Sequence, residues 1–217
     1  MTTPNDVTQY FGTLASAVAN TQVTDRNGAP QSLTEFYRRA IDWCRTAHEQ
    51  GNTVHLVGNG GSAGISSHIA TDLCKNAGIR ARAHNDASML TCLANDYSYE
   101  EVFARQLAMH ARAGDVVIVI SSSGKSKNML NAVSAARAAR ARVITLSGFG
   151  SDNPLRLMGD LNAYVGNTEY GFVEIAHLAL CHAIVDLANG WAATSVSTTS
   201  QTITSRPAEP VRLAVGA

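Results

Sequence analysis

The chain has 217 residues, which is enough for one sizeable α/β domain and hardly enough for two. Its formal net charge of +0 gives no electrostatic reason to expect a nucleic acid or an anionic membrane as a partner. With 45% hydrophobic residues, no apolar run of membrane-spanning length and no signal peptide, the sequence predicts a cytoplasmic globular protein. Four cysteines without Cys-x-x-Cys spacing are interpreted as reduced thiols of the core: Cys44, Cys74, Cys92 and Cys181.

Two helices are predicted ahead of the first strand, over residues 5–22 and 31–50. In the second segment, apolar residues recur at helical spacing from Leu33 to Cys44, and Gly51 is well suited to end the helix. Two helices in this position cannot cover both faces of a sheet and its edge as well. We therefore expect an N-terminal helical hairpin whose apolar face serves in subunit pairing.

From Thr53 onwards, short β-branched runs alternate with helical segments. Strands are predicted at 53–57, 79–83, 115–120, 142–146 and 161–165, and helices at 63–76, 98–113, 127–140, 153–158 and 169–189. This alternation predicts a five-stranded parallel sheet with right-handed crossovers, helices on both faces, and ligands beyond the carboxyl ends of the strands. Residues 1–190 are expected to form a single domain. The segment 191–217, rich in Ser and Thr, predicts a disordered tail.

The first glycine-rich turn, Gly58-Asn-Gly-Gly-Ser62, follows the strand predicted at 53–57. Asn59 and Gly60 lie in a stretch of backbone that can turn sharply and approach a ligand closely. Ser62 is predicted to be the N-cap of the next helix, where its hydroxyl and the free N–H groups favour an anion. The turn alone is a weak signal, because it is neither a P-loop nor a dinucleotide-binding fingerprint.

A second turn with similar chemistry, Ser121-Ser-Ser-Gly-Lys-Ser126, follows the strand predicted at 115–120. Four hydroxyls, a glycine and a helix N-terminus at the end of a central strand suit a phosphate monoester. For Ser126 taken alone, a plain helix N-cap is the better interpretation. Two such turns at two parallel strand ends predict that both face one crevice.

Together with Asn95-Asp96-Tyr97, these two turns resemble the sugar isomerase (SIS) domain, most of all the sedoheptulose 7-phosphate isomerase (phosphoheptose isomerase) family, from about residue 10 to 189. The resemblance implies a three-layer α-β-α sandwich of flavodoxin-like type, a phosphorylated sugar as substrate, and a homotetramer with sites at subunit contacts. It implies that the phosphate is held by Ser62, Ser121, Ser122, Ser123 and Ser126. It extends substrate binding to Asn59, Gly60, Asn95, Asp96 and Glu174.

Ketose–aldose isomerisation moves a proton between adjacent carbons through an enediol. It requires a base, a group that handles the oxygen-borne proton, and stabilisation of the developing oxyanion. At the positions where the family has His, Glu, Gln and His, this chain has His68, Asp72, Glu174 and His182. The resemblance implies that Asp72 and His182 form the acid/base pair and that all four hold Zn²⁺. Two histidines and two carboxylates suit a tetrahedral zinc site. For any single histidine, a structural role is the alternative.

Several departures from the family pattern affect the sugar site rather than the phosphate site. Asp72 is one methylene shorter than Glu, Glu174 replaces a neutral Gln with an anion, Gly171 replaces an Asp, and the segment 73–80 is shorter. The preferred hypothesis is an isomerase of a phosphorylated ketose such as sedoheptulose 7-phosphate. The alternatives are an SIS-fold enzyme for another phosphosugar and a non-catalytic SIS protein that serves as a binding platform, as a replication-initiator-binding relative does. Retention of four ligating groups favours an enzyme.

Overall fold

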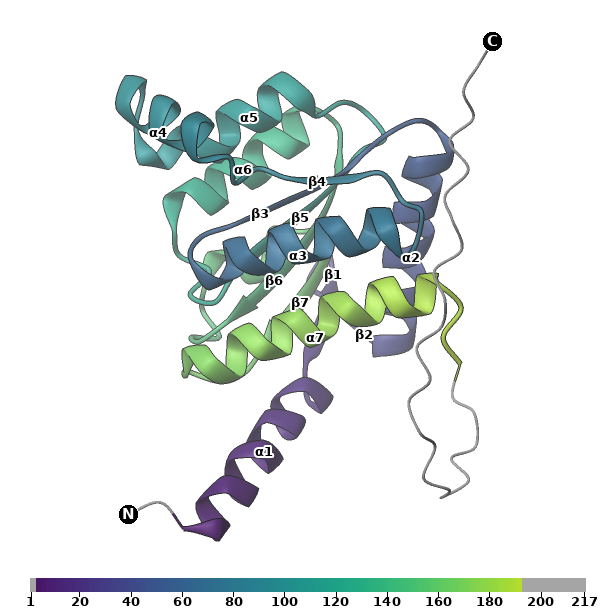
Figure 1. Cartoon of the computed structure of the whole chain (residues 1–217), viewed down its shortest axis with the longest axis vertical. Helices are drawn as coiled ribbons and strands as arrows, with labels where there is room; N and C mark the ends of the chain where they lie inside the picture. Colours follow the sequence, from purple (N-terminus) through teal and green to yellow (C-terminus); the bar gives the residue numbers. More distant parts are fainter. Residues whose placement is uncertain (1–2, 193–217) are drawn as a thin grey trace.

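A mixed seven-stranded sheet separates two layers of helices (Figure 1). The computed structural model describes residues 3–192. The strands are β1 (Gln22–Asp25), β2 (Pro30–Gln31), β3 (Val54–Gly58), β4 (Ala81–Ala83), β5 (Val116–Ser121), β6 (Arg142–Gly148) and β7 (Leu161–Val165). The helices are α1 (Pro4–Ala19), α2 (Leu33–Glu49), α3 (Gly61–Lys75), α4 (Ala87–Asp96), α5 (Val102–His110), α6 (Lys127–Ala138) and α7 (Tyr170–Ala188). Two short 3₁₀ helices are η1 (Tyr99–Glu101) and η2 (Pro154–Leu157).

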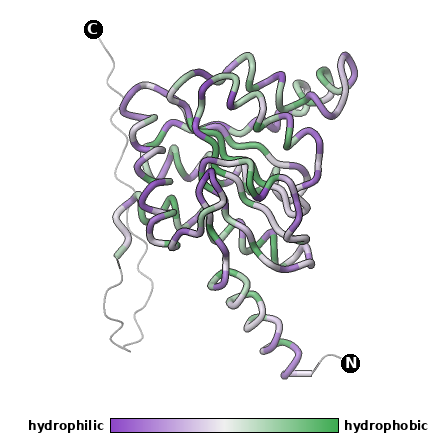
Figure 2. The backbone as a smooth tube through the Cα atoms, turned by 180° about the vertical axis from the view of Figure 1, so that it is seen from behind, coloured by the Kyte–Doolittle hydropathy of each residue, from purple (hydrophilic) through white to green (hydrophobic). Residues whose placement is uncertain are grey.

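The five predicted parallel strands form the body of the sheet, in the order β7-β6-β5-β3-β4. This is the flavodoxin-like order, and it confirms the predicted fold class. Strands β3, β5 and β7 are buried at every residue, because helices cover both faces of the sheet. Figure 2 shows the hydrophobic segments gathered in these central strands, while the hydrophilic segments lie towards the outside.

The edge of the sheet next to β7 differs from the prediction. Strands β1 and β2 form an antiparallel hairpin, and β1 also pairs antiparallel with β7. The hairpin turns at Gly28, whose φ of +77° is a left-handed conformation that favours glycine. Because the hairpin lies between α1 and α2, the expected N-terminal helical hairpin is wrong. Both helices instead pack against α7.

The helices divide into two layers with separate apolar cores. On one face of the sheet, α2, α3 and α7 pack over a large core cluster, and on the other face α4, α5 and α6 pack over a second one. Helix α1 projects from the first layer and contacts α7, where the Tyr10 and Phe172 ring centroids lie 4.7 Å apart (Figure 1). Within residues 3–192, α1 buries none of its own residues.

Other details of the prediction change as well. The helix predicted at 98–113 is shorter, because η1 precedes α5, and helix α4 was not predicted. The helix predicted at 153–158 is the 3₁₀ helix η2. Cys44 and Cys181 are core thiols as expected, whereas Cys74 and Cys92 are exposed. The tail predicted from residue 191 falls, from residue 193 on, outside the described residues.

Helix α7 is, among the described residues, long and apolar enough to cross a membrane. Half of its apolar window is buried inside the protein, as in the core helix of a globular domain. Its buried face includes Ala176, Leu180 and Ile184, which belong to the larger core cluster. The apolar character of α7 is therefore explained by packing against the sheet and the neighbouring helices.

Candidate functional site

The site lies where the strand order reverses. Strands β3 and β5 are parallel neighbours, and the chain leaves them in opposite directions, towards β4 on one side and β6 on the other. Their carboxyl ends, Gly58 and Ser121, lie on the same edge of the sheet, and α3 and α6 begin just beyond them. In open α/β sheets, this topological switch point is where ligands bind.

The first turn depends on glycine at two positions. Gly60 is the residue before α3 and has φ +54° and ψ −122°, a backbone conformation that residues with side chains rarely adopt. A Cβ atom on Gly58 would lie 2.6 Å from the carbonyl oxygen of Ser62, so the turn closes only without a side chain there. Helix α3 begins at Gly61, so the prediction that Ser62 is its N-cap is wrong. Ser62 is instead the second helical residue and is buried.

The second turn presents its serines to the same side. The backbone N–H of Gly124 donates to Ser121 Oγ at 3.1 Å, and the N–H of Lys125 lies 3.4 Å from Ser123 Oγ. Gly124 has φ +60° and faces the side chain of Asn153, so this position also requires glycine. Ser126 is the N-cap of α6, but its side chain makes no capping hydrogen bond within the described chain. Its hydroxyl is therefore free for a ligand.

Both turns line one cavity of about 100 Å³. Its lining residues are Asn59, Ser62, Ser121, Ser122, Ser123, Ser126, Tyr170 and Glu174. The helices α3 and α6 have no acidic residue in their first turns, and neither has a side-chain cap among the described residues. Free N–H groups and the positive ends of two helix dipoles, together with serine hydroxyls, make this cavity suited to an anion such as phosphate.

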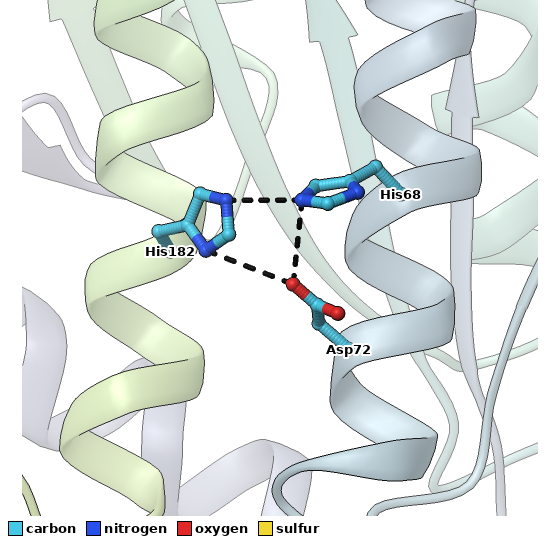
Figure 3. Close-up of side chains that lie close together, drawn as sticks. All are labelled: His68, Asp72 and His182. Atoms are coloured by element: carbon cyan, nitrogen blue, oxygen red, sulfur yellow. Dashed lines mark hydrogen bonds and ion pairs between the residues drawn. The ribbon is translucent and has the colours of Figure 1, made fainter. Parts of the chain in front are cut away.

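Three of the four residues predicted to carry the chemistry converge between α3 and α7 (Figure 3). His68 Nε2 lies 3.1 Å from His182 Nε2 and 3.3 Å from Asp72 Oδ2. His182 Nδ1 lies 3.8 Å from the same Asp72 oxygen. Residues 68 and 72 share one face of α3 because they are one helical turn apart. We call His68, Asp72 and His182 the His–Asp cluster.

The His–Asp cluster has the donor set of a zinc site. Two imidazole nitrogens and a carboxylate oxygen are the usual ligands of catalytic zinc, which keeps a fourth position open. Ligand atoms around a tetrahedral zinc ion bound at about 2.0–2.2 Å lie roughly 3.3 Å apart. The separations of 3.1 and 3.3 Å around His68 agree with that spacing. The cluster is partly exposed, so an ion has access to it.

Glu174 does not join this cluster in the structure. It lies on α7 eight residues before His182, and its carboxylate faces Gly61 at the start of α3, inside the serine-lined cavity. A spacing of eight residues corresponds to about 12 Å along a helix, which explains why the two side chains end in different places. Of the four predicted metal ligands, the structure thus brings together the three members of the His–Asp cluster.

The remaining predicted residues occupy different surroundings. Asn59 exchanges two amide hydrogen bonds of 3.0 Å with Asn128, and its Oδ1 also accepts one of 2.9 Å from Tyr99. It therefore holds the first turn in place as well as lining the cavity. Asn95 and Asp96 lie exposed at the end of α4 and hydrogen-bond to each other, outside the cavity lining. Their expected contact with the substrate stays a prediction.

Sequence reasoning missed two residues of the site, Tyr170 and Asn128. Tyr170, the first residue of α7, lines the cavity, and nothing in the local sequence distinguishes it from a surface tyrosine. Asn128 is buried in the first turn of α6 and pairs with Asn59. An asparagine two residues after an N-cap serine is a weak signal, because its hydrogen-bond partner Asn59 lies in the separate turn after β3.

Comparison with known proteins agrees with this geometry. The SIS domain model matches residues 22–148. The phosphoheptose isomerase of Citrifermentans bemidjiense is 34% identical over 161 residues, which cover 71% of this chain and 83% of that protein. The phosphoheptose isomerase of Burkholderia pseudomallei is 36% identical over 167 residues, covering 73% of this chain and 83% of that protein.

A solved structure gives the same result. The phosphoheptose isomerase from Neisseria gonorrhoeae superimposes with a TM-score of 0.72 at 28% identity, covering 85% of this chain and 98% of that one. The SIS domain match over residues 22–148 contains both turns and two members of the His–Asp cluster, His68 and Asp72. The fold, the switch-point cavity and the sequence identity lead to one conclusion. The chain belongs to the SIS domain family, within the group formed by the phosphoheptose isomerases.

Proposed function

We propose that this protein is a phosphosugar isomerase that converts sedoheptulose 7-phosphate to an aldose phosphate through an enediol. The observation that supports it best is the presence of two different sites along the same pair of helices. One is the serine-lined cavity at the start of α3, which suits a phosphate group. The other is the His–Asp cluster farther along α3 and α7, which offers acid and base groups.

The spacing of the two sites suits a long sugar chain. Six residues separate Ser62 in the cavity from His68 in the cluster, which is about 9 Å along a helix. In an extended seven-carbon ketose 7-phosphate, seven bonds separate C2 from phosphorus, and at an advance of about 1.3 Å per bond they span roughly 9 Å. Each carbon removed shortens this span by about 1.3 Å. A seven-carbon substrate therefore places its reacting carbons at the cluster when its phosphate is in the cavity.

The two proton transfers are assigned to Asp72 and His182. The Asp72 carboxylate takes the proton from C1 of the ketose, and the same proton is returned at C2, which converts the ketose to the aldose. The His182 imidazole moves the proton between the oxygens on these two carbons, so that the enediol is never left as an unshielded dianion. Asp72 Oδ2 is within 4 Å of both histidines, so the carboxylate lies beside the two imidazoles rather than pointing away from them.

Zn²⁺ is part of the proposal, because the donor set fits it. His68, Asp72 and His182 would hold the ion. When bound, zinc supplies Lewis-acid stabilisation to oxygens on the reacting carbons. The contribution of the chain is to orient these ligands from two packed helices, α3 and α7, which hold them on a rigid frame.

The proposal includes a homotetramer in the cytoplasm. Helix α1 displays Val7, Tyr10 and Phe11, which are 49%, 47% and 61% exposed. Large apolar side chains gathered on a projecting helix mark an interaction surface, and closed symmetry with copies of the same chain is the commonest way to cover one.

The test is a coupled isomerase assay with seven-, six- and five-carbon phosphoketoses. We expect turnover to be highest with sedoheptulose 7-phosphate. Asp72→Asn should lower kcat by about 100-fold or more, because it removes the proton acceptor. Asp186→Asn, an equal charge change at an exposed position one turn beyond His182 on α7, should leave kcat unchanged.

The outcomes separate the two alternatives. Turnover of a shorter phosphoketose only would show that the departures at Asp72 and Gly171 have changed the sugar. Gly171 faces the hydroxyl of Tyr10, which lies 3.4 Å from the position of a Cβ atom there. No turnover of any phosphoketose by the zinc-loaded protein would refute the enzyme and leave a phosphosugar-binding protein.

A further inference from the structure

The serine-lined cavity contains a negative charge of its own. Among the described residues that line it, only Glu174 is charged, and no lysine or arginine lines it. The carboxylate of Glu174 covers Gly61, since a Cβ atom on Gly61 would fall 2.3 Å from Glu174 Oε2. An acidic side chain thus lies at the start of α3, in the place where the helix dipole favours an anion.

No cation of the described chain neutralises this carboxylate. Lys125 within the serine-rich turn pairs with Asp152 at 3.6 Å, and Lys127 just after the turn pairs with Glu100 at 3.0 Å. None of the ion pairs or hydrogen bonds found within residues 3–192 involves the Glu174 side chain. Its negative charge therefore has no hydrogen-bonded or ion-paired partner among the described residues, although it lies at the N-terminal end of α3, where a phosphate would bind.

We propose that Glu174 opposes binding of the substrate phosphate, because its carboxylate lies beside the start of α3 in the same cavity, repels the phosphate and moves aside when the phosphate binds. This inference rests on the proposed function, because it assumes that the cavity is the phosphate site. The carboxylate lines the same cavity of about 100 Å³ that would hold the phosphate, so the two anions repel each other at short range. Glu174 thereby lowers the affinity for phosphate and shortens the residence of phosphorylated product.

The position of Glu174 allows this movement. It is half-buried on the first turns of α7, and Gly61 opposite it offers no side chain to trap it. A glutamate has three rotatable bonds, so its carboxylate can leave the cavity without any change in the backbone. Gly61 is thus needed for a specific reason: any side chain there would displace the carboxylate from its place.

The experiment measures binding of inorganic phosphate by titration calorimetry to the full chain and to Glu174→Gln. Gln keeps the shape and removes the charge, so we expect Glu174→Gln to bind phosphate at least about tenfold more tightly. Glu174→Ala should bind more tightly as well. Glu169→Gln, which makes the same change of net charge at an exposed residue just before α7, should bind phosphate like the unchanged protein.

The possible results are distinct. Equal or weaker phosphate binding by folded Glu174→Gln and Glu174→Ala overturns the inference, while leaving the phosphate site and the proposed function intact. If neither the unchanged protein nor the variants bind phosphate, the cavity is not an anion site and the proposed function fails with the inference. In the isomerase assay, the supporting result also includes a lower KM for the phosphoketose and stronger inhibition by inorganic phosphate in Glu174→Gln.

Discussion

At the scale of single residues, the His–Asp cluster is a group of side chains with little structural use. His68 is about half exposed, and its two close neighbours are Asp72 and His182. Two imidazole nitrogens 3.1 Å apart need either a shared proton or a bound cation between them, because two lone pairs facing each other repel. A cluster that is exposed, polar and held by two helices is therefore better explained by ligand binding than by stability.

Removal of one imidazole should release the proposed metal. We expect the unchanged protein, after dialysis against metal-free buffer, to retain about one zinc ion per chain, and His68→Ala to lose it. His48→Ala, which removes an exposed histidine on α2, should retain zinc. The measurement is zinc per chain by atomic spectroscopy. Equal zinc content in His68→Ala and the unchanged protein would contradict the metal assignment, although the acid/base roles would remain open to the kinetic test.

His177, three residues after Glu174, is a buried histidine with a structural role. Its side chain is fully buried, with Nε2 3.1 Å from the carbonyl oxygen of Ser147. Nδ1 has no hydrogen-bond partner among the described residues. Burial lowers the pKa of His177 to about 4, because the charged imidazolium would lose its hydration. The neutral ring, donating from Nε2, is the form that the fold accommodates.

This lowered pKa makes the fold sensitive to acid. Between pH 6.5 and 4, the unfolded chain binds a proton at His177 that the folded chain does not, so the stability contribution present above pH 6.5 is lost as pH falls. The loss is up to about 1.4 kcal/mol per pH unit. Burial also lowers the pKa of His55 and of His84, so these residues add to the acid sensitivity of the fold. The contribution of His177 is therefore the difference in stability between the unchanged protein and a His177 variant. Urea unfolding of His177→Gln at pH 7, 6, 5 and 4 should show a shallower acid slope. Parallel curves would contradict this account.

At the scale of helices and strands, the sequence correctly predicts the elements whose secondary structure is determined by their own local pattern of residues. β-Branched runs such as Val116-Val-Ile-Val-Ile120 are buried on both faces and become central parallel strands. Glycine followed by serine at a strand end becomes a turn and a helix N-terminus. Both glycine- and serine-rich turns could therefore be predicted from the local sequence. The meeting of His68 with His182 could be predicted only through the family resemblance.

The elements that the sequence does not reveal depend on partners distant along the chain. Strand β1 has four residues and β2 has two, and they exist because β7 offers an open edge for pairing. The position of Glu174 is a similar case. Its spacing of eight residues from His182 predicts a separation of about two turns along α7, but not that its carboxylate lies opposite Gly61. Which residue of α3 lies opposite a given residue of α7 depends on how the two helices pack, and the local sequence does not specify that packing.

A buried polar chain shows how far such distant pairing extends. His55 on β3 lies 3.0 Å from Asp115 through Nε2 and 2.9 Å from His84 through Nδ1, and His84 Nδ1 lies 3.2 Å from Gln106. Asp115 also accepts hydrogen bonds from the backbone N–H groups of Thr53, just before β3, and of Arg112, just after α5. This chain ties the edge strand β4 to the centre of the sheet and to α5. Its members are scattered over sixty residues, and no local pattern marks them.

At the scale of the whole molecule, helix α1 is the part that a single protomer leaves unexplained. It extends away from the body (Figure 1) and meets it mainly through α7. A capping box at Thr3 and Asp6 stabilises its start, but an isolated helix of this length is marginal in water without packing. Its well-formed helix therefore requires another surface, and the proposed homotetramer provides one in copies of the same chain.

Replacing apolar residues of α1 should change the assembly. We expect Val7→Ser combined with Phe11→Ser to convert the tetramer to smaller species, because each exposed apolar side chain would lose burial worth about 1.5–3 kcal/mol. Gln9→Ala, on the same helix, should leave the assembly unchanged. The measurement is mass by sedimentation equilibrium at several protein concentrations. A monomeric unchanged protein would refute the tetramer, and an intact tetramer in the double variant would assign the contact to a surface other than α1. Because Tyr10 also lies beside Gly171, at the start of the helix that carries Glu174 and His182, loss of the α1 contact should lower kcat as well as mass.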